Sequence, residues 1–327
     1  MNSAVSPTSG TPREPRFVQV DQADHAAARG ELIRGLTAAA ASTSPKFLYD
    51  ALGSRLFEAI TELPEYYPTR TEAAIFAEHS QNMAQAIGVG GTLIDLGAGN
   101  CAKAMRLMPA LQPAHYVAVD ISVDFLREAL RNVQLMHPAL DVMGVGLDFS
   151  HSLRLPANSV EGRPVFFYPG SSIGNFTPVE AQAFLASVRE KASGGGLLIG
   201  VDLVKAAGLL EAAYDDALGV TAAFNLNLLL HLNRLIGSDF SPRDWCHIGL
   251  FNTERSRIEM HLEARREVLV TWPGGTRRFH AGERMHTENS YKYTADGFAA
   301  LLQAAGFETS QRWLDPQGWF AVFWARS

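Results

Sequence analysis

Apolar runs of strand length alternate with helical stretches along the middle of this chain. The runs that predict strands are residues 92–96, 115–121, 142–147, 163–168 and 197–201. Apolar positions at helical spacing predict helices over residues 101–111, 123–136 and 179–192. Near-continuous apolar strands separated by amphipathic helices are typical of a parallel sheet that is covered on both faces. We therefore predict an α/β fold with a doubly wound, mainly parallel sheet.

The alternation breaks after the fifth strand and resumes only near the end of the chain. Between these points the pattern predicts a helical stretch over 205–236, irregular chain over 239–251, and long antiparallel strands over 257–272 and 276–293. A helix over 295–305 follows, and strands over 308–314 and 319–325 form a closing β-hairpin. The break indicates an insertion that forms a second, α+β domain.

The N-terminal third adds helices and a prolyl loop before the first strand of the sheet. Residues 18–41 are polar at first and then helical in pattern, residues 63–70 read as a loop, and Thr71 is expected to cap a helix that ends near Gly88. The domains that we predict are a disordered leader over 1–15, a discontinuous substrate-binding domain over 16–70 and 205–292, and a ligand-binding core over 71–204 and 293–327.

Charge and composition narrow the class of partner. A formal net charge of -6 with 28 Lys and Arg argues against nucleic acid as the main partner. The two cysteines lie far apart and indicate neither a disulfide framework nor a zinc site. No signal peptide and no run of transmembrane length is visible. We expect a cytoplasmic, monomeric protein that acts on a small molecule, without a membrane partner.

A glycine turn follows the first predicted strand of the core. Gly97 and Gly99 let backbone N–H groups approach a nucleotide-like ligand at a helix N-terminus, and Asp120 lies where a ribose-binding acid is expected. The same pattern fits NAD, S-adenosylmethionine, or a tight turn that binds nothing. The turn alone therefore leaves the ligand open.

The end of the chain and the residues around the turn resemble class I methyltransferases, which have a Rossmann-like fold. A closing β-hairpin is typical of that class, and Asp95 stands two residues before Gly97 as in its acidic loop. The resemblance implies S-adenosylmethionine, with Gly97 against its methionyl part, Asp120 on both ribose hydroxyls, Asp148 on the adenine amino group and Phe149 on the ring. Alternatively, each acid only caps a helix and Phe149 belongs to the core.

Six further motifs point to one family within that class. They are residues 46–50 (KFLYD), 63–70 (LPEYYPTR), 170–176 (GSSIGNF), 213–216 (AYDD), 224–227 (FNLN) and 286–293 (HTENSYKY). Together they resemble the histidine Nα-methyltransferases of ergothioneine biosynthesis, from about residue 30 to the C-terminus. The resemblance implies trimethylation of free L-histidine to hercynine with S-adenosylmethionine as methyl donor.

The resemblance assigns three residues to the reacting end of the substrate. Asn175 and Tyr214 are implied to hold the substrate carboxylate, and both are neutral donors able to do so. Tyr66 is implied to lie near the imidazole. The alternative interpretations are that Asn175 caps the following helix, that Tyr214 is a buried tyrosine, and that Tyr66 packs in a loop.

Four residues of the insertion are implied to complete the substrate site. Glu288 and Ser290 lie two apart on a predicted strand, so both side chains point the same way. The resemblance implies that they bind the imidazole nitrogens, whereas a Glu-x-Ser pair on a strand is otherwise usually a solvated face. Met260 is implied to line the imidazole pocket, although a strand methionine is more often core. Asn289 lies in the same motif and is counted among the substrate-binding residues. Asn289 and Tyr291 stand where some relatives carry smaller or apolar residues. Because both side chains alternate away from Glu288, we expect this difference to have little effect on substrate binding.

Two further cofactor contacts and the question of a metal remain. Tyr49 and Lys103 match cofactor contacts of the family, Lys103 being suited to a carboxylate. His261, His280 and His286 share the insertion, but a third ligand at suitable spacing is not obvious. We therefore expect no metal.

Other functions compete with histidine methylation. The same fold acting on tryptophan or a modified histidine is the nearest enzyme alternative, and Glu288 weakly favours an imidazole over an indole. A non-catalytic S-adenosylmethionine-binding module would not need Asn175, Tyr214 and Glu288 intact. An NAD oxidoreductase lacks a recognisable hydride-relay residue.

Overall fold

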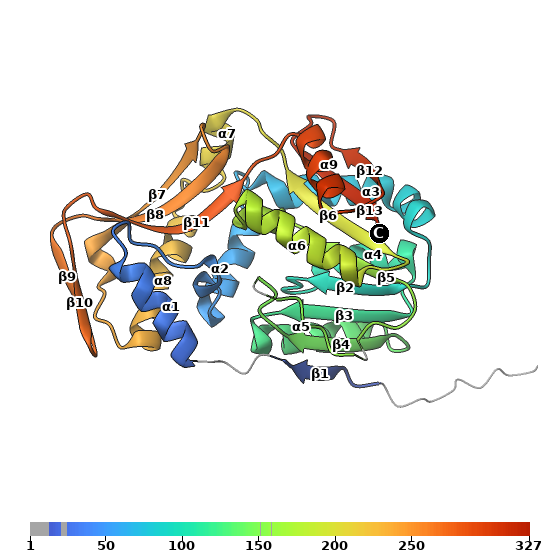
Figure 1. Ribbon diagram of the computed structural model, residues 1–327, viewed down its shortest axis with the longest axis horizontal. Coiled ribbons are helices and arrows are strands. Elements are labelled where there is room, and N and C mark those ends of the chain that lie inside the picture. The colour runs from blue at the N-terminus through green and yellow to red at the C-terminus, as the bar shows by residue number, and fades with distance from the viewer. Residues whose placement is uncertain (1–12, 21–24, 151, 158) are drawn as a thin grey trace, which may run out of the picture.

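The computed structural model describes residues 13–20, 25–150, 152–157 and 159–327. Residues 1–12 of the expected leader lie outside this described part. Figure 1 shows a large sheet covered by helices on one side of the molecule and a smaller region of helices and antiparallel strands on the other. The chain enters the smaller region twice, once near its N-terminus and once after residue 202.

The larger part is built on an eight-stranded sheet with the order β1-β4-β3-β2-β5-β6-β13-β12. Its strands are β1 (Arg16–Gln19), β2 (Thr92–Leu96), β3 (His115–Asp120), β4 (Asp141–Gly146), β5 (Pro164–Tyr168), β6 (Gly196–Asp202), β12 (Thr309–Leu314) and β13 (Phe320–Arg326). The six strands from β1 to β6 pair in parallel, whereas β13 pairs antiparallel with β6 and β12. The predicted parallel sheet with a closing hairpin is confirmed.

Helices cover both faces of this sheet because its strands are apolar on both faces. The helices are α3 (Tyr67–Ile87), α4 (Ala102–Leu111) and α5 (Val123–Met136) on one face, and α6 (Pro178–Lys191) and α9 (Ala295–Ala304) on the other. The start of α6 is fixed by a capping box in which Thr177 and Glu180 bond each other's backbone. The helix predicted over 179–192 is confirmed to within one residue at each end.

The smaller part has its own hydrophobic core. Its elements are α1 (His25–Thr37), η1 (Pro45–Leu48), α2 (Ala51–Thr61), α7 (Ala207–Ala212), α8 (Val220–Ile236), η3 (Pro242–Asp244), β7 (Trp245–Asn252), β8 (Arg257–Ala264), β9 (Val268–Trp272), β10 (Gly275–Phe279) and β11 (Arg284–Tyr291). Leu36 and Leu48 pack in one cluster with Leu228, Trp245 and Phe279. This cluster supports the predicted discontinuous domain, which we keep as a proposal.

Two predictions for the N-terminal third are wrong. Residues 16–19 form β1, which pairs with β4 at the edge of the main sheet instead of starting the smaller part. Helix α3 begins at Tyr67, so Pro68 occupies its first turn and Thr71 lies inside the helix. Proline is well suited to a first helical turn because its missing N–H has no partner there in any case.

Within the insertion, the helical stretch and the antiparallel strands occur where we predicted them, but each is divided into shorter elements. Residues 239–251, expected to be irregular, contain β7, which pairs with β8 in a three-stranded sheet of order β11-β8-β7. The two long strands are each divided, so that β9 and β10 form a separate hairpin. The helical stretch is divided as well, into α7 and α8. Asp216, in the segment between them, accepts hydrogen bonds from the N–H groups of Val220 and Thr221 and so stabilises the start of α8.

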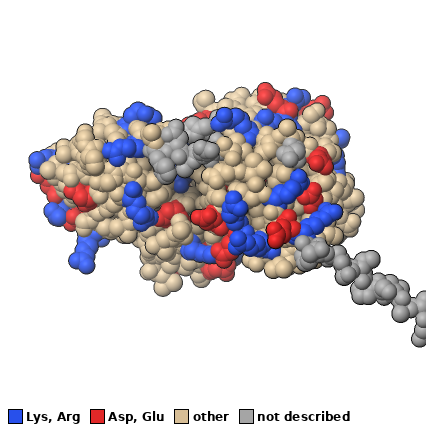
Figure 2. Space-filling view, turned by 90° about the horizontal axis from the view of Figure 1, so that it is seen from below, with Lys and Arg blue, Asp and Glu red and all other residues tan. Residues whose placement is uncertain are grey.

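The surface carries mixed charge on the face seen in Figure 2, where basic and acidic side chains are interspersed. This face therefore has no extended surface of one sign. Within the described ranges, no helix is both long enough and apolar enough to cross a membrane.

A glycine lets the loop after β5 pack directly on β11. This loop contains the short helix η2 (Ser172–Asn175), and a Cβ at Gly174 would lie 2.8 Å from the backbone oxygen of Tyr291 and 3.1 Å from its nitrogen. Only a residue without a side chain permits this approach. The contact places Asn175, the next residue, between the two parts of the molecule.

We expect Gly174→Ala to lower the free energy of unfolding by roughly 1–3 kcal/mol, because its Cβ would push η2 away from the β11 backbone. Gly208→Ala is the matched control, since Gly208 is exposed in α7 and its Cβ would meet nothing within 4 Å. Urea denaturation of both variants measures the difference. Equal stability of the two variants would show that the close contact is unimportant.

Candidate active site

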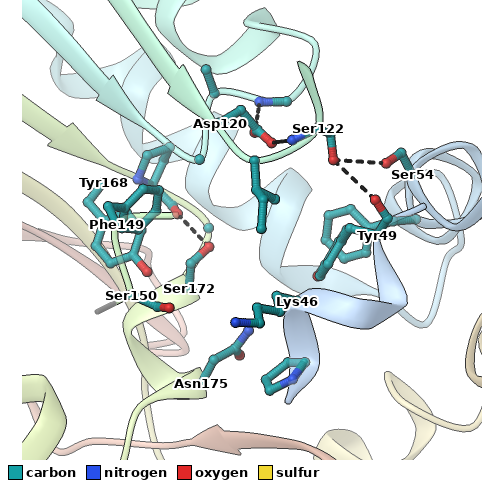
Figure 3. A pocket seen from close by; sticks show the side chains of 18 of the residues that line it. Lys46, Tyr49, Ser54, Asp120, Ser122, Phe149, Ser150, Tyr168, Ser172 and Asn175 are labelled. Atoms are coloured by element: carbon teal, nitrogen blue, oxygen red, sulfur yellow. Dashed lines mark hydrogen bonds between the residues drawn. The ribbon is translucent and has the colours of Figure 1, made fainter. Parts of the chain in front are cut away.

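A cavity of about 760 Å³ lies between the two parts of the molecule. One wall is formed by the carboxyl ends of the parallel strands, where ligands bind in doubly wound sheets. The other wall comes from the N-terminal helices and from β11. The predicted site residues that line it are Tyr49, Tyr66, Gly97, Lys103, Asp120, Asp148, Phe149, Asn175 and Asn289. In Figure 3, Lys46 and Asn175 extend into the same space from opposite walls.

The glycine turn and Asp120 form one end of the cavity. Gly97 and Gly99 have φ angles of 70° and 53°, which favour glycine. Asp120 accepts from the backbone N–H of Gly99 at 2.9 Å and of Ser122 at 2.8 Å (Figure 3). A Cβ on Gly99 would meet nothing within 4 Å, so open space lies beyond the turn.

The electrostatics of Asp120 suit a hydroxyl-bearing ligand. Burial raises the pKa of its carboxyl, although the backbone N–H groups of Ser122 and Gly99 lower it. Each carboxylate oxygen keeps a second lone pair beyond its backbone hydrogen bond. The carboxyl is therefore able to accept from a ribose diol, and the turn fits S-adenosylmethionine.

Asp148 is tied to the N-terminal segment. Lys46 in η1 lies 3.1 Å from Asp148 and 2.9 Å from Glu31 in α1, so it bridges the two walls. Burial raises the pKa of the Asp148 carboxyl, but hydrogen bonds from Ser150 and the charge of Lys46 outweigh it and hold this pKa below its usual value. Asp148 therefore pairs with a cation, a contact that the sequence analysis missed, and its role at the adenine stays a prediction.

Lys103 has a buried acid as its partner. Its ammonium lies 2.8 Å from Oε2 of Glu72, whose Oε1 accepts from the N–H of Gly170. Gly170 has a φ of 77°, and a Cβ there would lie 2.6 Å from the Lys103 nitrogen. Lys103 is still partly exposed to the cavity. A ligand carboxylate at this point would therefore meet a cation that Glu72 already holds in place.

Tyr49, Tyr66 and Tyr214 are all near enough to Glu288 for its charge to act on their hydroxyls. The rings of Tyr66 and Tyr214 lie 6.0 Å apart in an edge-on contact. Burial raises the pKa of each tyrosine well above its usual value, and repulsion from Glu288 adds to the shift in all three. These side chains are accordingly neutral hydrogen-bond donors at physiological pH.

Glu288 is a buried acid with an unused acceptor. It is 7% exposed, and its Oε2 has no hydrogen-bond partner among the described residues. Burial raises the pKa of its carboxyl to about 7, and the charge of Lys292 opposes this rise. A buried carboxyl oxygen without a partner is costly, so its presence suggests a ligand that supplies a donor.

The remaining insertion residues occupy different surroundings. Tyr214 Oη and Ser290 Oγ lie 2.8 Å apart and share a hydrogen bond, so the predicted carboxylate and imidazole residues are neighbours. Met260 is a core residue opposite Glu288 in the β8–β11 ladder. Like Tyr214, Glu288 and Ser290, it is not among the residues that line the cavity. Asn289 alternates away from Glu288 as predicted, but it lines the cavity and bonds His286 at 2.9 Å. The expectation that it has little effect therefore loses its basis.

The histidines of the insertion do not form a ligand cluster. Glu259 lies 3.1 Å from His261, whose ring contacts that of His286, and His280 is exposed. No group of three His, Cys, Asp or Glu in the described part of the chain is arranged to hold a metal ion.

Sequence reasoning assigned no role to several residues near the site. Lys46, Tyr67 and Lys292 lay inside the quoted motifs, so their positions were a usable signal. Asp202 ends β6, as Asp120 ends β3, and an acid at a strand end was the signal that could have found it. Nothing in the local pattern around Glu72 distinguishes it from other helical acids.

Known proteins are similar to this chain along nearly all of its length. A family model described as histidine-specific methyltransferase, SAM-dependent, matches residues 28–327. Histidine N-alpha-methyltransferase of Mycolicibacterium smegmatis is 40% identical over 304 residues, which are 90% of this chain and 94% of that protein. The Mycobacterium tuberculosis protein of the same name is 38% identical over 92% of this chain and 95% of its own length. Ergothioneine biosynthesis protein 1 of Neurospora crassa is 33% identical over 81% of this chain and 31% of its own length.

The raised pKa of Glu288 predicts a pH-dependent stability. The folded protein keeps a proton that the unfolded chain releases between its ordinary pKa of 4.5 and about 7, so this carboxyl's contribution to stability is lost as pH rises through that window. The unfolding free energy of wild type should therefore fall by roughly 3 kcal/mol relative to that of Glu288→Gln between pH 4, just below the window, and pH 8, just above it.

Urea denaturation of wild type and variant at the two pH values measures this difference. Glu254→Gln is the control, because Glu254 is exposed in the turn between β7 and β8. A wild type and a Glu288→Gln variant with the same pH dependence would contradict the buried, proton-holding state.

Proposed function

The chain belongs to the family of histidine-specific, S-adenosylmethionine-dependent methyltransferases, and from this we propose that it trimethylates the α-amino nitrogen of free L-histidine. The product is the betaine hercynine, and the reaction is a step of ergothioneine biosynthesis, in keeping with the names of its relatives. S-adenosylmethionine is the methyl donor.

The observation that carries the proposal is the unpaired oxygen of Glu288. An imidazole N–H is a donor of the right kind for this buried carboxyl, whereas an indole or a phenyl ring offers one donor in another place or none. Tyr66 and Ser290 lie near the same acid and can serve the other ring nitrogen. An apolar side chain would leave Oε2 of Glu288 without a partner.

The cofactor would be held by the strand-end wall of the cavity. Asp120 would take the ribose hydroxyls, with Gly97 beside the methionyl part. Asp148 and Phe149 would meet the adenine. Tyr49 and Lys103 would contact the remaining polar groups. When bound, S-adenosylmethionine supplies an electrophilic methyl group on a sulfonium.

The chain's own residues then have to bring a neutral amine into line with that methyl. An ammonium nitrogen has no lone pair to attack with, so the site must accept the amine in its neutral form. Asn175 and Tyr214 would hold the substrate carboxylate, and Glu288 with Ser290 would hold the imidazole. Fixing both ends of the amino acid orients its nitrogen, and such positioning supplies most of the rate enhancement.

The wider organisation follows the same proposal. The discontinuous domain of residues 16–70 and 205–292, less β1, would bind histidine, and the sheet with its helices would bind the cofactor. The hydrophobic cluster shared by Leu36, Leu228 and Phe279 supports this division. That the protein is a cytoplasmic monomer with no nucleic-acid partner and no metal is an expectation from sequence.

Incubation with labelled S-adenosylmethionine and single free amino acids tests the function. We expect label to enter histidine, with the mass of the trimethylated product, and histamine to react very poorly because it lacks the carboxylate. Label in tryptophan alone, or in no amino acid, would contradict the proposal.

The role of Glu288 is tested in the same assay. Glu288→Ala should lower kcat/KM for histidine by a factor that corresponds to roughly 2–3 kcal/mol, because a charged hydrogen bond is lost. The value of kcat/KM for tryptophan should stay the same or rise. If both substrates decline by the same factor, Glu288 supports the fold and does not read the imidazole.

Asp120→Ala should weaken binding of S-adenosylhomocysteine by roughly 2–3 kcal/mol, because two charge-assisted hydrogen bonds to the ribose are lost. Isothermal titration calorimetry measures the change. Asp124→Ala is the matched control, since Asp124 is exposed in the first turn of α5. Unchanged affinity in Asp120→Ala would remove Asp120 from the cofactor site.

A further inference from the structure

Lys292 is a buried cation directly behind two of the proposed substrate residues. Its side chain is 0% exposed, and its ammonium lies 2.7 Å from Oδ2 of Asp202. The same nitrogen donates to Ser290 Oγ at 2.8 Å and to Tyr214 Oη at 3.1 Å. An ammonium has three hydrogens, so these three acceptors use them all. A buried lysine this fully bonded has one defined position.

The charges around Asp202 do not balance within the cluster. The carboxylate of Asp202 also pairs with the ammonium of Lys205 at 2.5 Å and accepts a hydrogen bond from the Tyr67 hydroxyl at 2.7 Å. Two ammonium groups therefore share one carboxylate. Glu288 is a nearby acid whose pKa Lys292 affects through charge, but it receives none of the three ammonium hydrogens. Asp315 also acts on Lys205 through charge, whereas Lys292 is the cation whose hydrogens reach Tyr214 and Ser290.

The direction of the hydrogen bonds follows from the ammonium. Because Lys292 can only donate, Tyr214 and Ser290 must each accept from it. The bond between the two hydroxyls, 2.8 Å long, uses one of their two hydrogens. One hydroxyl hydrogen remains, and it can be donated to a group outside the trio. The pair is thereby set to bind an acceptor such as a carboxylate oxygen.

Neutral donors alone are a poor match for a buried carboxylate. Asn175 and Tyr214 offer hydrogen bonds but no charge, and burying an anion without an opposite charge is costly. A cation that donates to the hydroxyl donor polarises it and strengthens its bond to the anion. Lys292 is such a cation, because its ammonium donates directly to the Tyr214 hydroxyl.

We propose that Lys292, acting through Tyr214 and Ser290, makes the site selective for substrates that carry an α-carboxylate. The proposal rests on the function proposed above and adds a positioning residue to it. Lys205, which pairs with the same Asp202 but has neither hydroxyl as a partner among its hydrogen bonds, is assigned no such role.

The test compares L-histidine with L-histidinamide, which keeps the imidazole and the α-amine and lacks the anion. Loss of the charge in Lys292→Met should lower the ratio of kcat/KM for histidine over histidinamide by about tenfold or more, mainly by raising KM for histidine. Lys292→Arg, which keeps the charge, should retain most of the ratio. Lys205→Met is the matched control and should keep the wild-type ratio.

Binding of S-adenosylhomocysteine and the thermal midpoint identify folded variants. If Lys292→Met does not fold, Lys292→Gln takes its place, because glutamine is neutral and can still bond the hydroxyls. Equal loss on both substrates, or the same loss of ratio in Lys205→Met, would overturn the proposal and leave Lys292 a structural residue.

The role of Lys292 can be tested even if the proposed function is wrong. If the wild type methylates a different amino acid, the same ratio is measured with that amino acid and its amide, and the inference about the carboxylate is tested unchanged. If the wild type methylates none, calorimetric titration of the cofactor-product complex with histidine and histidinamide gives the ratio as affinities. A wild type without preference for the acid would overturn the inference.

Discussion

The carboxylate of Asp202 is the interaction on which the two parts of the molecule depend. It ends β6 in the main sheet, accepts from Tyr67 at the start of α3, and pairs with Lys292 at the end of the insertion. Its own N–H donates to Ser171 Oγ at 2.9 Å, just before η2. Removing one partner of such a buried pair typically costs about 3–5 kcal/mol. This one group therefore contacts elements of both parts of the molecule.

The site is an interface inside a single chain. The loop after β5 contacts β11 through Gly174, η1 reaches the strand ends through Lys46, and residue Ser42 bridges to His286. The first two contacts join different hydrophobic cores, whereas the bridge from Ser42 to His286 lies within the smaller part. The positions of Asn175 and Glu288 therefore depend on packing in both parts. Polar groups left unsatisfied within this interface, above all the Glu288 oxygen, mark where a ligand has to complete it.

Predictions from sequence were most accurate where a local pattern is sufficient. The strand 92–96 and the helix 123–136 match β2 and α5 residue for residue, because an apolar run or a helical stripe is a property of neighbouring residues. The glycine turn with Asp120 was placed correctly for the same reason. The motif resemblance added Asn175, Tyr214 and Glu288, which no periodicity would have selected, and their functional roles stay predictions.

The sequence by itself determined the class of fold, the parallel order of alternating strands and helices, the strand-end position of the glycine turn, and the family. Only the tertiary structure decided that β1 joins the sheet edge, that 245–252 is a strand, and that Lys46 pairs with Asp148, Glu72 with Lys103 and Lys292 with Asp202. The physical reason is that each of these features depends on a tertiary partner. β1, Lys46 and Lys292 have partners far away in the sequence, Glu72 pairs with a lysine in the neighbouring helix, and β7 pairs with the next strand, β8. Local propensity carries no information about such partners.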